Sequence, residues 1–394
     1  MLQASQSYST INAIVPRPAA NEVIDAICQR DNASVLVWKA RGTLVKDHWR
    51  RSWLPAVSPA RVMLQMLVPD PEVESVVATV VQRSRLDLQA TGAVFSSPCQ
   101  QTYFGSAFNA WPVSEAAASS RKELALKNSL NAIFCIVGHA SSDRVARAAM
   151  DVGAHGPVVY YCEGRGLRDR VGWLRITKEA EKEVLMVMAD DADVEEVFDA
   201  MAKAGGLHLP GRGFMYRVPI SAGLYNLPSR VSHHHYEANM QQVINAIDHL
   251  TGHTHWRDQG VFELGQARGA GIELESNQGA VLEDQRCLTA IVDRDNLQTL
   301  MDLLLEAGAP GLNLNHSRCI RKHSESAAAG SQVAHEYSVL RCITSAELAD
   351  QICGHVSETA GSAELQDVCL LVNEVPKVAT YVPGDKNYRR QSAA

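Results

Sequence analysis

The first residues in this chain that could do chemistry are basic and aromatic side chains between residues 41 and 61. Within the segment RGTLVKDHWRRSWLPAVSPAR, three cations are interleaved with two tryptophans over residues 46–53, namely Lys46, Trp49, Arg50, Arg51 and Trp53. The whole protein has a formal charge of −7, so this segment differs from the average surface. Because Trp and Arg contribute most to the energy of protein interfaces, we predict that these five residues dock a protein partner. The alternative is a solvated loop whose tryptophans fold back onto the body.

Six histidines form a second group of candidate ligands. They flank a predicted helix, with His233, His234 and His235 at its start and His249, His253 and His255 at its end. Imidazoles at close spacing suit zinc or nickel. The two groups lie roughly 14 residues apart, or about 20 Å along a helix, and cannot share one metal ion unless the helix bends. Solvated or capping histidines are therefore the default, and a metal site at residues 233–235 is the alternative.

No arrangement of residues is organised for catalysis. The chain holds no G-x-S-x-G elbow, no P-loop, no H-E-x-x-H motif and no cysteine with a patterned histidine, so we predict that it is not an enzyme. The negative charge argues against a nucleic-acid partner. No apolar run approaches the roughly 20 residues that span a bilayer, and the N-terminus shows no signal peptide. Nine cysteines without a C-x-x-C pair fit a cytoplasmic protein whose thiols are mostly small core residues.

The elements that would position these residues repeat three times. INAIV (11–15), LNAIF (130–134) and LTAIV (288–292) each introduce a helical stretch and then a second strand. A further strand and amphipathic helix follow, and VMLQMLVPDPEVESVVATVV (62–81) aligns without a gap on EVLMVMADDADVEEVFDAMA (183–202). The third copy of this half is weaker. With a closing strand, each copy has the order strand, helix, strand, strand, helix, strand, which is the split βαβ of a ferredoxin-like module.

We therefore predict an α+β fold of three ferredoxin-like modules. They cover residues 9–112, 128–225 and 286–384, and residues 226–285 form a connecting helix and a glycine-rich linker. Strands such as VLMVM and AIFCIV are apolar at consecutive positions, which indicates sheets that are buried on both faces. The two helices of a module cover only one face. Three modules bury the other faces if they pack around a shared axis, so we expect an intramolecular pseudo-trimer.

The second module resembles the PII-like signalling proteins, which are homotrimers of βαββαβ subunits. The resemblance is carried by GAHGPVVYYCEGRGLRDRVG, ITKEAEKEVLMVM and LHLPGRGFMYRVP, and modules one and three enter it through internal repetition. In that family, a loop between the second and third strands (the T-loop) docks partners. A glycine-rich loop before the last strand (the B-loop) helps to hold a ligand.

The resemblance also implies a set of ligand-binding residues. They are Gly164, Arg165, Gly166 and Arg168 at the T-loop base, and Gly211, Arg212 and Gly213 in the B-loop. Glycines let backbone N–H groups approach an anion, and arginines add charge and hydrogen bonds. The alternative for a G-x-G motif is a turn that needs positive φ.

Several positions depart from the family pattern. Nucleotide-binding members place a lysine after the B-loop glycine, where this chain has Ala93 and Phe214. The third module has RCI (318–320) in place of G-x-G, and Lys377 is the one basic candidate after a last strand. We therefore expect one or two of the three clefts, at most, to bind ligand.

The resemblance implies a regulatory protein that binds an adenine nucleotide or a bicarbonate-like metabolite in clefts between modules. Its partner would be a transporter or an enzyme of inorganic carbon or nitrogen metabolism. Contact with a membrane would then be peripheral, because the chain shows no transmembrane segment of its own. Two alternatives stay open. One is a constitutive structural subunit of a larger assembly, such as a membrane transporter complex, that has lost sensing, and the other is a metal-binding protein that uses the histidine segment.

Overall fold

The structure is a computed structural model, and it describes most of the chain. The described residues are 3–5, 8–30, 32–42, 60–86, 92–108, 110–112, 126–166, 181–226, 281–322, 332–359 and 365–381. Within them the fold is α+β, and every strand pairing is antiparallel, in agreement with the predicted fold class. None of their helices has the length and apolar character needed to cross a membrane.

Three sets of six elements follow one another along the chain. Module 1 comprises β2 (Tyr8–Pro16), α1 (Arg17–Ile27), β3 (Ser34–Gly42), β4 (Ala60–Pro69), α2 (Val73–Ser84) and β5 (Gly92–Phe104). Module 2 comprises β6 (Leu130–Val137), α3 (Ser142–Asp151), β7 (His155–Gly166), β8 (Glu181–Asp190), α4 (Val194–Gly205) and β9 (Gly213–Ile220). Module 3 comprises β11 (Val281–Asp293), α7 (Leu297–Glu306), β12 (Gly311–Lys322), β13 (Gln332–Ser345), α8 (Ala346–Thr359) and β14 (Val368–Thr380).

The strand order is the same in each set. It runs β5-β2-β4-β3, β9-β6-β8-β7 and β14-β11-β13-β12, so that the first and third strands are central. This order is compatible with three repeated ferredoxin-like modules. The remaining described elements are short: β1 (Gln3–Ser5), β10 (Ala222–Asn226) and the 3-10 turns η2 (Asp70–Glu72) and η3 (His139–Ser141).

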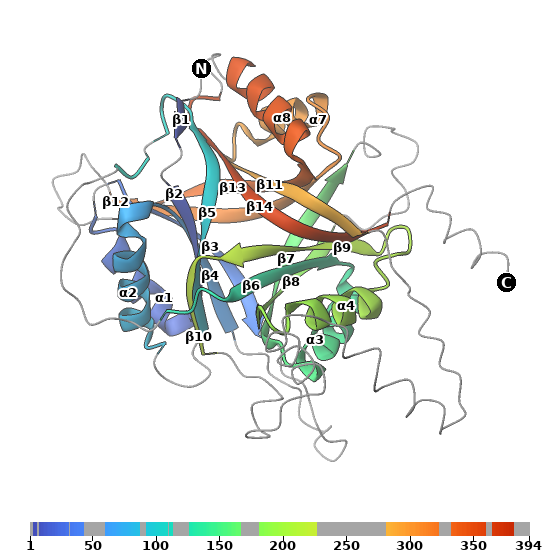
Figure 1. The fold of residues 1–394 in the computed structure, drawn as a ribbon. Helices are drawn as coiled ribbons and strands as arrows, with labels where there is room; N and C mark the ends of the chain where they lie inside the picture. The colour runs from blue at the N-terminus through green and yellow to red at the C-terminus, as the bar shows by residue number, and fades with distance from the viewer. Residues whose placement is uncertain are drawn as a thin grey trace, which may run out of the picture.

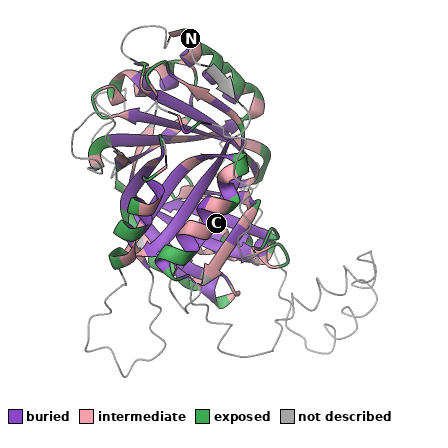
Figure 2. Cartoon of the chain, turned by 90° about the vertical axis from the view of Figure 1, so that its left-hand side faces the viewer, coloured by how far each residue is buried: buried purple, intermediate pink, exposed green. Residues whose placement is uncertain are grey.

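Each helix pair lies on the outside of its own sheet (Figure 1). α2 shows why, because Val73, Val76, Val77 and Val80 recur at helical spacing and are all buried. Figure 2 shows the same division, with purple strands inside and green residues on the outer sides of the helices. Three separate apolar clusters fill the space between helices and sheet, one in each module.

A fourth apolar cluster joins the opposite faces of the three sheets. It contains Ile14 from module 1, Phe134 from module 2 and Ile291 from module 3. All eight residues of β6 are buried, which is possible only because both of its faces are covered. The predicted burial of both sheet faces is therefore confirmed.

Strand pairing also connects the modules to one another. The end of β3 pairs with the start of β7, the end of β7 with the start of β12, and the end of β12 with the start of β3. These three strands thus form a closed triangle, in which each module is hydrogen-bonded to the other two. The last strands meet as well, because β14 pairs with both β5 and β9.

Gly92 and Gly213 each begin the last strand of their module, and they show which residues of the two modules correspond. A Cβ added to Gly92 would lie 1.9 Å from the carbonyl oxygen of Ile14, and a Cβ added to Gly213 would lie 1.9 Å from that of Ile136. The same close approach occurs in both modules, so Ile14 corresponds to Ile136. INAIV therefore corresponds to IFCIV at 133–137.

The predicted equivalence of INAIV with LNAIF (130–134) was thus wrong by three residues. Ile11 and Ile133 both face the helices of their modules, whereas Leu130 belongs to the central cluster. An odd shift in register exchanges the two faces of a strand. The sequence could not reveal the correct register, because a strand that is buried on both faces is apolar in either register.

All nine cysteines are buried, and none of them forms a disulfide. Cys28 packs in the helix-facing cluster of module 1, and Cys135 does so in module 2. Their role as small core residues is confirmed.

We expect a chromogenic thiol reagent at pH 8 to modify none of the nine thiols in the native protein and all of them after denaturation. The thiolate is the reactive form, and burial raises the pKa of Cys28 and of Cys135 to about 12. Absorbance of the released chromophore gives the count. Stoichiometric labelling of native protein within minutes would contradict the buried positions.

Candidate functional site

Several predicted site residues lie outside the described part of the chain. They are the docking residues Lys46, Trp49, Arg50, Arg51 and Trp53, the ligand residue Arg168, and the candidate metal ligands His233, His234 and His235. The connecting helix predicted after residue 235 lies outside it too. These assignments stay predictions. Among the described residues, no group of three or more His, Cys, Asp or Glu side chains is placed to hold a metal ion.

The predicted T-loop base is extended strand. Residues 164–166 belong to β7 and pair with residues 311–313 at the start of β12. Neither Gly164 nor Gly166 has a positive φ, so the alternative of a turn at this G-x-G is wrong. The Arg165 guanidinium donates a hydrogen bond to Glu163 at 2.7 Å. The backbone of this part of the predicted ligand site therefore pairs with β12 of module 3, and its arginine binds a glutamate of its own strand.

The predicted B-loop has the backbone that its glycines suggest. Gly211 and Gly213 have φ values of 77° and 119°, which L side chains rarely adopt. Arg212 between them is exposed. Gly213 is also required by the close approach to Ile136, so the fold alone accounts for this glycine, with or without a ligand.

The B-loop and the T-loop base lie at the same end of the module 2 sheet but are not adjacent. Gly213 pairs with Val137, Val137 with Glu183, and Glu183 with Tyr161, three residues before the G-x-G. Three strand spacings correspond to about 14 Å. A bicarbonate ion cannot contact both elements at once, whereas an extended ligand can.

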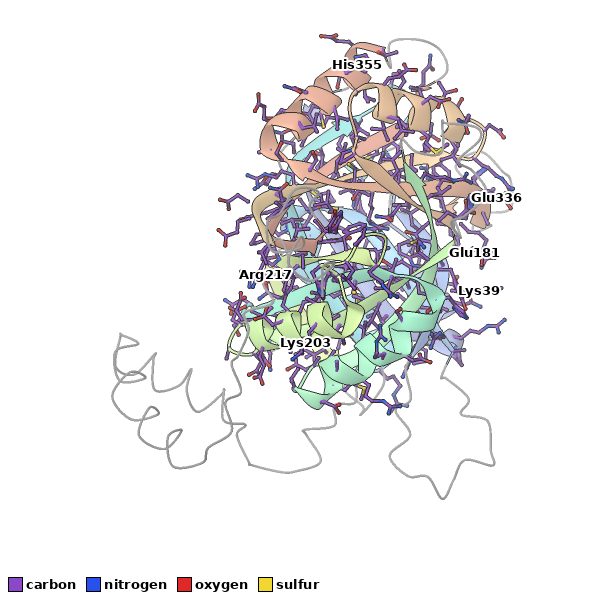
Figure 3. All side chains as sticks on the ribbon, turned by 90° about the vertical axis from the view of Figure 1, so that its right-hand side faces the viewer. Lys39, Glu181, Lys203, Arg217, Glu336 and His355 are labelled. Carbon is purple, nitrogen blue, oxygen red and sulfur yellow. The ribbon has the colours of Figure 1, made fainter. Side chains whose placement is uncertain are left out.

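A large cleft opens over the triangle of β3, β7 and β12. It has a volume of about 1050 Å³, and residues of all three modules line it. Figure 3 labels one such residue from each module, Lys39, Glu181 and Glu336, along one side of the molecule. None of the predicted ligand residues that the structure describes is among the lining residues. In the sequence, the predicted docking segment follows directly after β3, which ends at Gly42.

Charged groups line this cleft, and cations outnumber carboxylates. The cations are Arg17, Lys39, Arg61, Arg294 and Arg318, beside the imidazoles of His139 and His316, and the carboxylates are Glu163, Glu181 and Glu336. Arg294 and Glu336 form an ion pair with each other. The local excess of positive charge is notable in a protein whose net charge is −7. The sequence did not indicate this cleft, because its residues come from distant segments.

A buried carboxylate joins modules 1 and 2 beside the cleft. Glu183 is fully buried, and Arg41 of β3 donates to it at 3.2 Å. Nδ1 of His139 lies 2.9 Å from the same oxygen, and Ser142 donates to the other one. Burial lowers the pKa of Arg41, but the hydrogen bonds and charges of Glu183 and Asp143 outweigh it and raise the pKa. The sequence did not single out Glu183, because it ends the charged run KEAEKE (178–183) directly before an apolar run.

The basic candidate of module 3 is bound within the chain. Nζ of Lys377 forms an ion pair with Glu195 of α4 and lies 4.8 Å from the centre of the Phe198 ring. Arg217 donates to the same glutamate at 2.6 Å. Burial raises the pKa of Glu195, but the two cations outweigh it, so the pKa lies below its usual value. Lys377 thus connects modules 3 and 2.

Comparison with known proteins does not assign a family. No protein-family model matches the chain, and no curated protein matches it. Among solved structures it is similar to aspartate kinase from Synechocystis, with a TM-score of 0.20 and 10% identity over 94% of this chain and 44% of that chain. It is also similar to an anthrone oxidase-like protein, with a TM-score of 0.17 and 12% identity over 57% of this chain and 97% of that chain. The chain spans less than half the length of the kinase chain, and similarity this low supports no argument about function.

Proposed function

We propose that the chain is a PII-like regulatory protein without enzymatic activity, whose three modules act together as an intramolecular counterpart of a trimer. The closed triangle of strands and the shared central cluster support this arrangement. The observation that carries the functional proposal is the cleft of about 1050 Å³, because residues from all three modules form it. Concave sites at the junctions of modules are where proteins preferentially bind ligands.

The proposed effector is an anion of the size of an adenine nucleotide. The excess of cations in the cleft favours negative charge. The volume of the cleft, about 1050 Å³, favours a ligand of nucleotide size over bicarbonate. In this proposal Lys39 and Arg318, two exposed cations that line the cleft, provide charge-assisted contacts to the effector.

The proposed partner docks on the face that carries the cleft. The cationic side chains there and the basic segment at 41–61 complement an acidic surface. By its resemblance to PII-like proteins, the chain would regulate a transporter or an enzyme of inorganic carbon or nitrogen metabolism in the cytoplasm.

One observation favours the alternative of a structural subunit that has lost sensing. Lys377 and Arg165, two of the basic residues considered for ligand binding, are paired with Glu195 and Glu163 of the same chain. Cations that are already paired contribute less to the binding of an anion. Calorimetry distinguishes the two proposals.

We expect titration calorimetry to detect an adenine nucleotide among ATP, ADP, AMP and bicarbonate, and Arg318→Ala in the lining of the cleft to weaken that binding about 10- to 100-fold. The factor corresponds to the loss of one hydrogen bond to a charged group, about 1.5–3 kcal/mol. Lys203→Ala, at an exposed position of α4, is the matched control and should bind like the wild type. Absence of heat from all four compounds at millimolar concentration would reject the sensor and leave the structural subunit.

A further inference from the structure

Arg341 places a positive charge in the region where the three sheets meet. It lies on β13, between Asn313 of β12 and Thr289 of β11. Its guanidinium donates to Asn315 at 3.1 Å and to Gln65 of module 1 at 3.0 Å, and it lies 5.7 Å from the centre of the Trp38 ring. One side chain thus connects strands of two modules inside the central cluster.

The sister modules carry no charge at the corresponding position. The second residues of INAIV, IFCIV and LTAIV pair with Gln65, Met186 and Arg341 respectively, so these three residues are equivalent. A glutamine and a methionine therefore occupy the same place in the other modules. Arginine is not needed to build this strand.

Arg341 has no counter-charge among the described residues. Its two hydrogen bonds reach neutral amide oxygens, and no carboxylate lies within ion-pair distance of it. Burial raises the pKa of Cys287, and it raises that of Tyr216 well above its usual value, so both neighbours are neutral near pH 7. Arg341 is half-buried, and a charge that is partly removed from water without a counter-charge is destabilising.

A cavity of about 40 Å³ borders the guanidinium. Arg341 is the one charged residue in its lining, and it keeps three of its five N–H donors outside the two hydrogen bonds above. Asn12 and Thr289 add an amide and a hydroxyl group from modules 1 and 3, whereas Thr10 donates to the carbonyl of Ser97 and Asn373 to that of Pro98. At roughly 10–15 Å³ for each water-sized group, the volume admits only a small ligand.

We propose that this cavity binds a small monovalent anion of the size of chloride, held by Arg341, the hydroxyl group of Thr289 and the amide group of Asn12. The anion neutralises the guanidinium at the junction of the modules and stabilises the folded chain. This site is separate from the effector cleft, because the two share no lining residue, and the proposal does not depend on the proposed function.

The test follows thermal unfolding of the full chain while chloride replaces gluconate at constant ionic strength. The midpoint temperature of unfolding should rise with the chloride concentration. Above the dissociation constant, each tenfold increase in chloride should multiply the folding equilibrium constant about tenfold. Bromide should act like chloride. Arg341→Met and Arg341→Gln, which introduce the side chains of the sister modules, should both abolish the dependence. Arg144→Gln, at an exposed position of α3, should retain it.

Crystals grown in bromide provide a second readout that needs no variant. An anomalous peak beside the Arg341 guanidinium would support the site even if both variants fail to fold. A midpoint that does not respond to halide would overturn the proposal. So would a dependence that persists in a folded Arg341 variant, or a cavity that contains only water.

Discussion

Gly213→Ala is expected to lower the free energy of unfolding by about 3–4 kcal/mol. The new Cβ would lie 1.9 Å from the carbonyl oxygen of Ile136, at a φ of 119° that alanine rarely adopts. The obstacle is backbone in a central strand, so no flexible side chain can move aside. Gly92→Ala should cost a similar amount, because it meets the oxygen of Ile14 in the same way.

Gly138→Ala is the matched control for this prediction. A Cβ there meets nothing within 4 Å, and the φ of −67° suits any residue. Its effect should stay within about 0.5 kcal/mol or be slightly stabilising. Urea denaturation of the three variants gives the comparison, and equal stability of the Gly213 and Gly138 variants would contradict the close approach. The result also matters for binding studies, because weaker ligand binding by a Gly213 variant could come from the damaged fold. Arg212 is therefore the better position at which to test the B-loop.

Glu183→Gln is expected to destabilise the protein by about 3 kcal/mol. The substitution keeps the shape of the side chain but removes the charge that Arg41 and Ser142 contact inside the protein. The guanidinium of Arg41 then keeps only the exposed carboxylate of Asp143 as a charged partner in module 2. Chemical denaturation measures the loss.

An exposed ion pair supplies the control for Glu183. The side chains of Arg294 and Glu336 are 64% and 63% exposed, so Glu336→Gln should change stability by less than about 1 kcal/mol. A double-mutant cycle with Arg41→Met isolates the coupling between Arg41 and Glu183. A coupling no larger than that of the exposed pair would show that the buried carboxylate does not hold the modules together.

The order of elements could be predicted because the hydrophobic pattern and the internal repeat indicate the same strands and helices. Apolar runs of strand length alternate with amphipathic stretches such as α2, whose valines recur at helical spacing. The internal repeat then extended this pattern to the weaker third copy. The exact correspondence of residues could not be read in this way, as the three-residue error at LNAIF shows, because strands that are buried on both faces lack the alternation that fixes register.

The contacts between modules were beyond sequence reasoning for a different reason. Arg41 meets Glu183, and Arg341 meets Gln65, across long separations in the chain and without any periodic signal. The backbone conformation of the glycines was predicted correctly in one loop and wrongly in the other. Gly211 and Gly213 adopt the left-handed backbone that glycine allows, whereas the G-x-G at 164–166 is ordinary strand.

The three pairs of modules are joined by different chemistry. Arg41 meets a buried carboxylate between modules 1 and 2, and Lys377 meets Glu195 between modules 3 and 2. Between modules 3 and 1, Arg321 lies 5.5 Å from the ring of Phe108. In a homotrimer one mutation alters every junction simultaneously. In this single chain, each junction is formed by its own residues. A mutation can therefore weaken one junction while the other two stay intact.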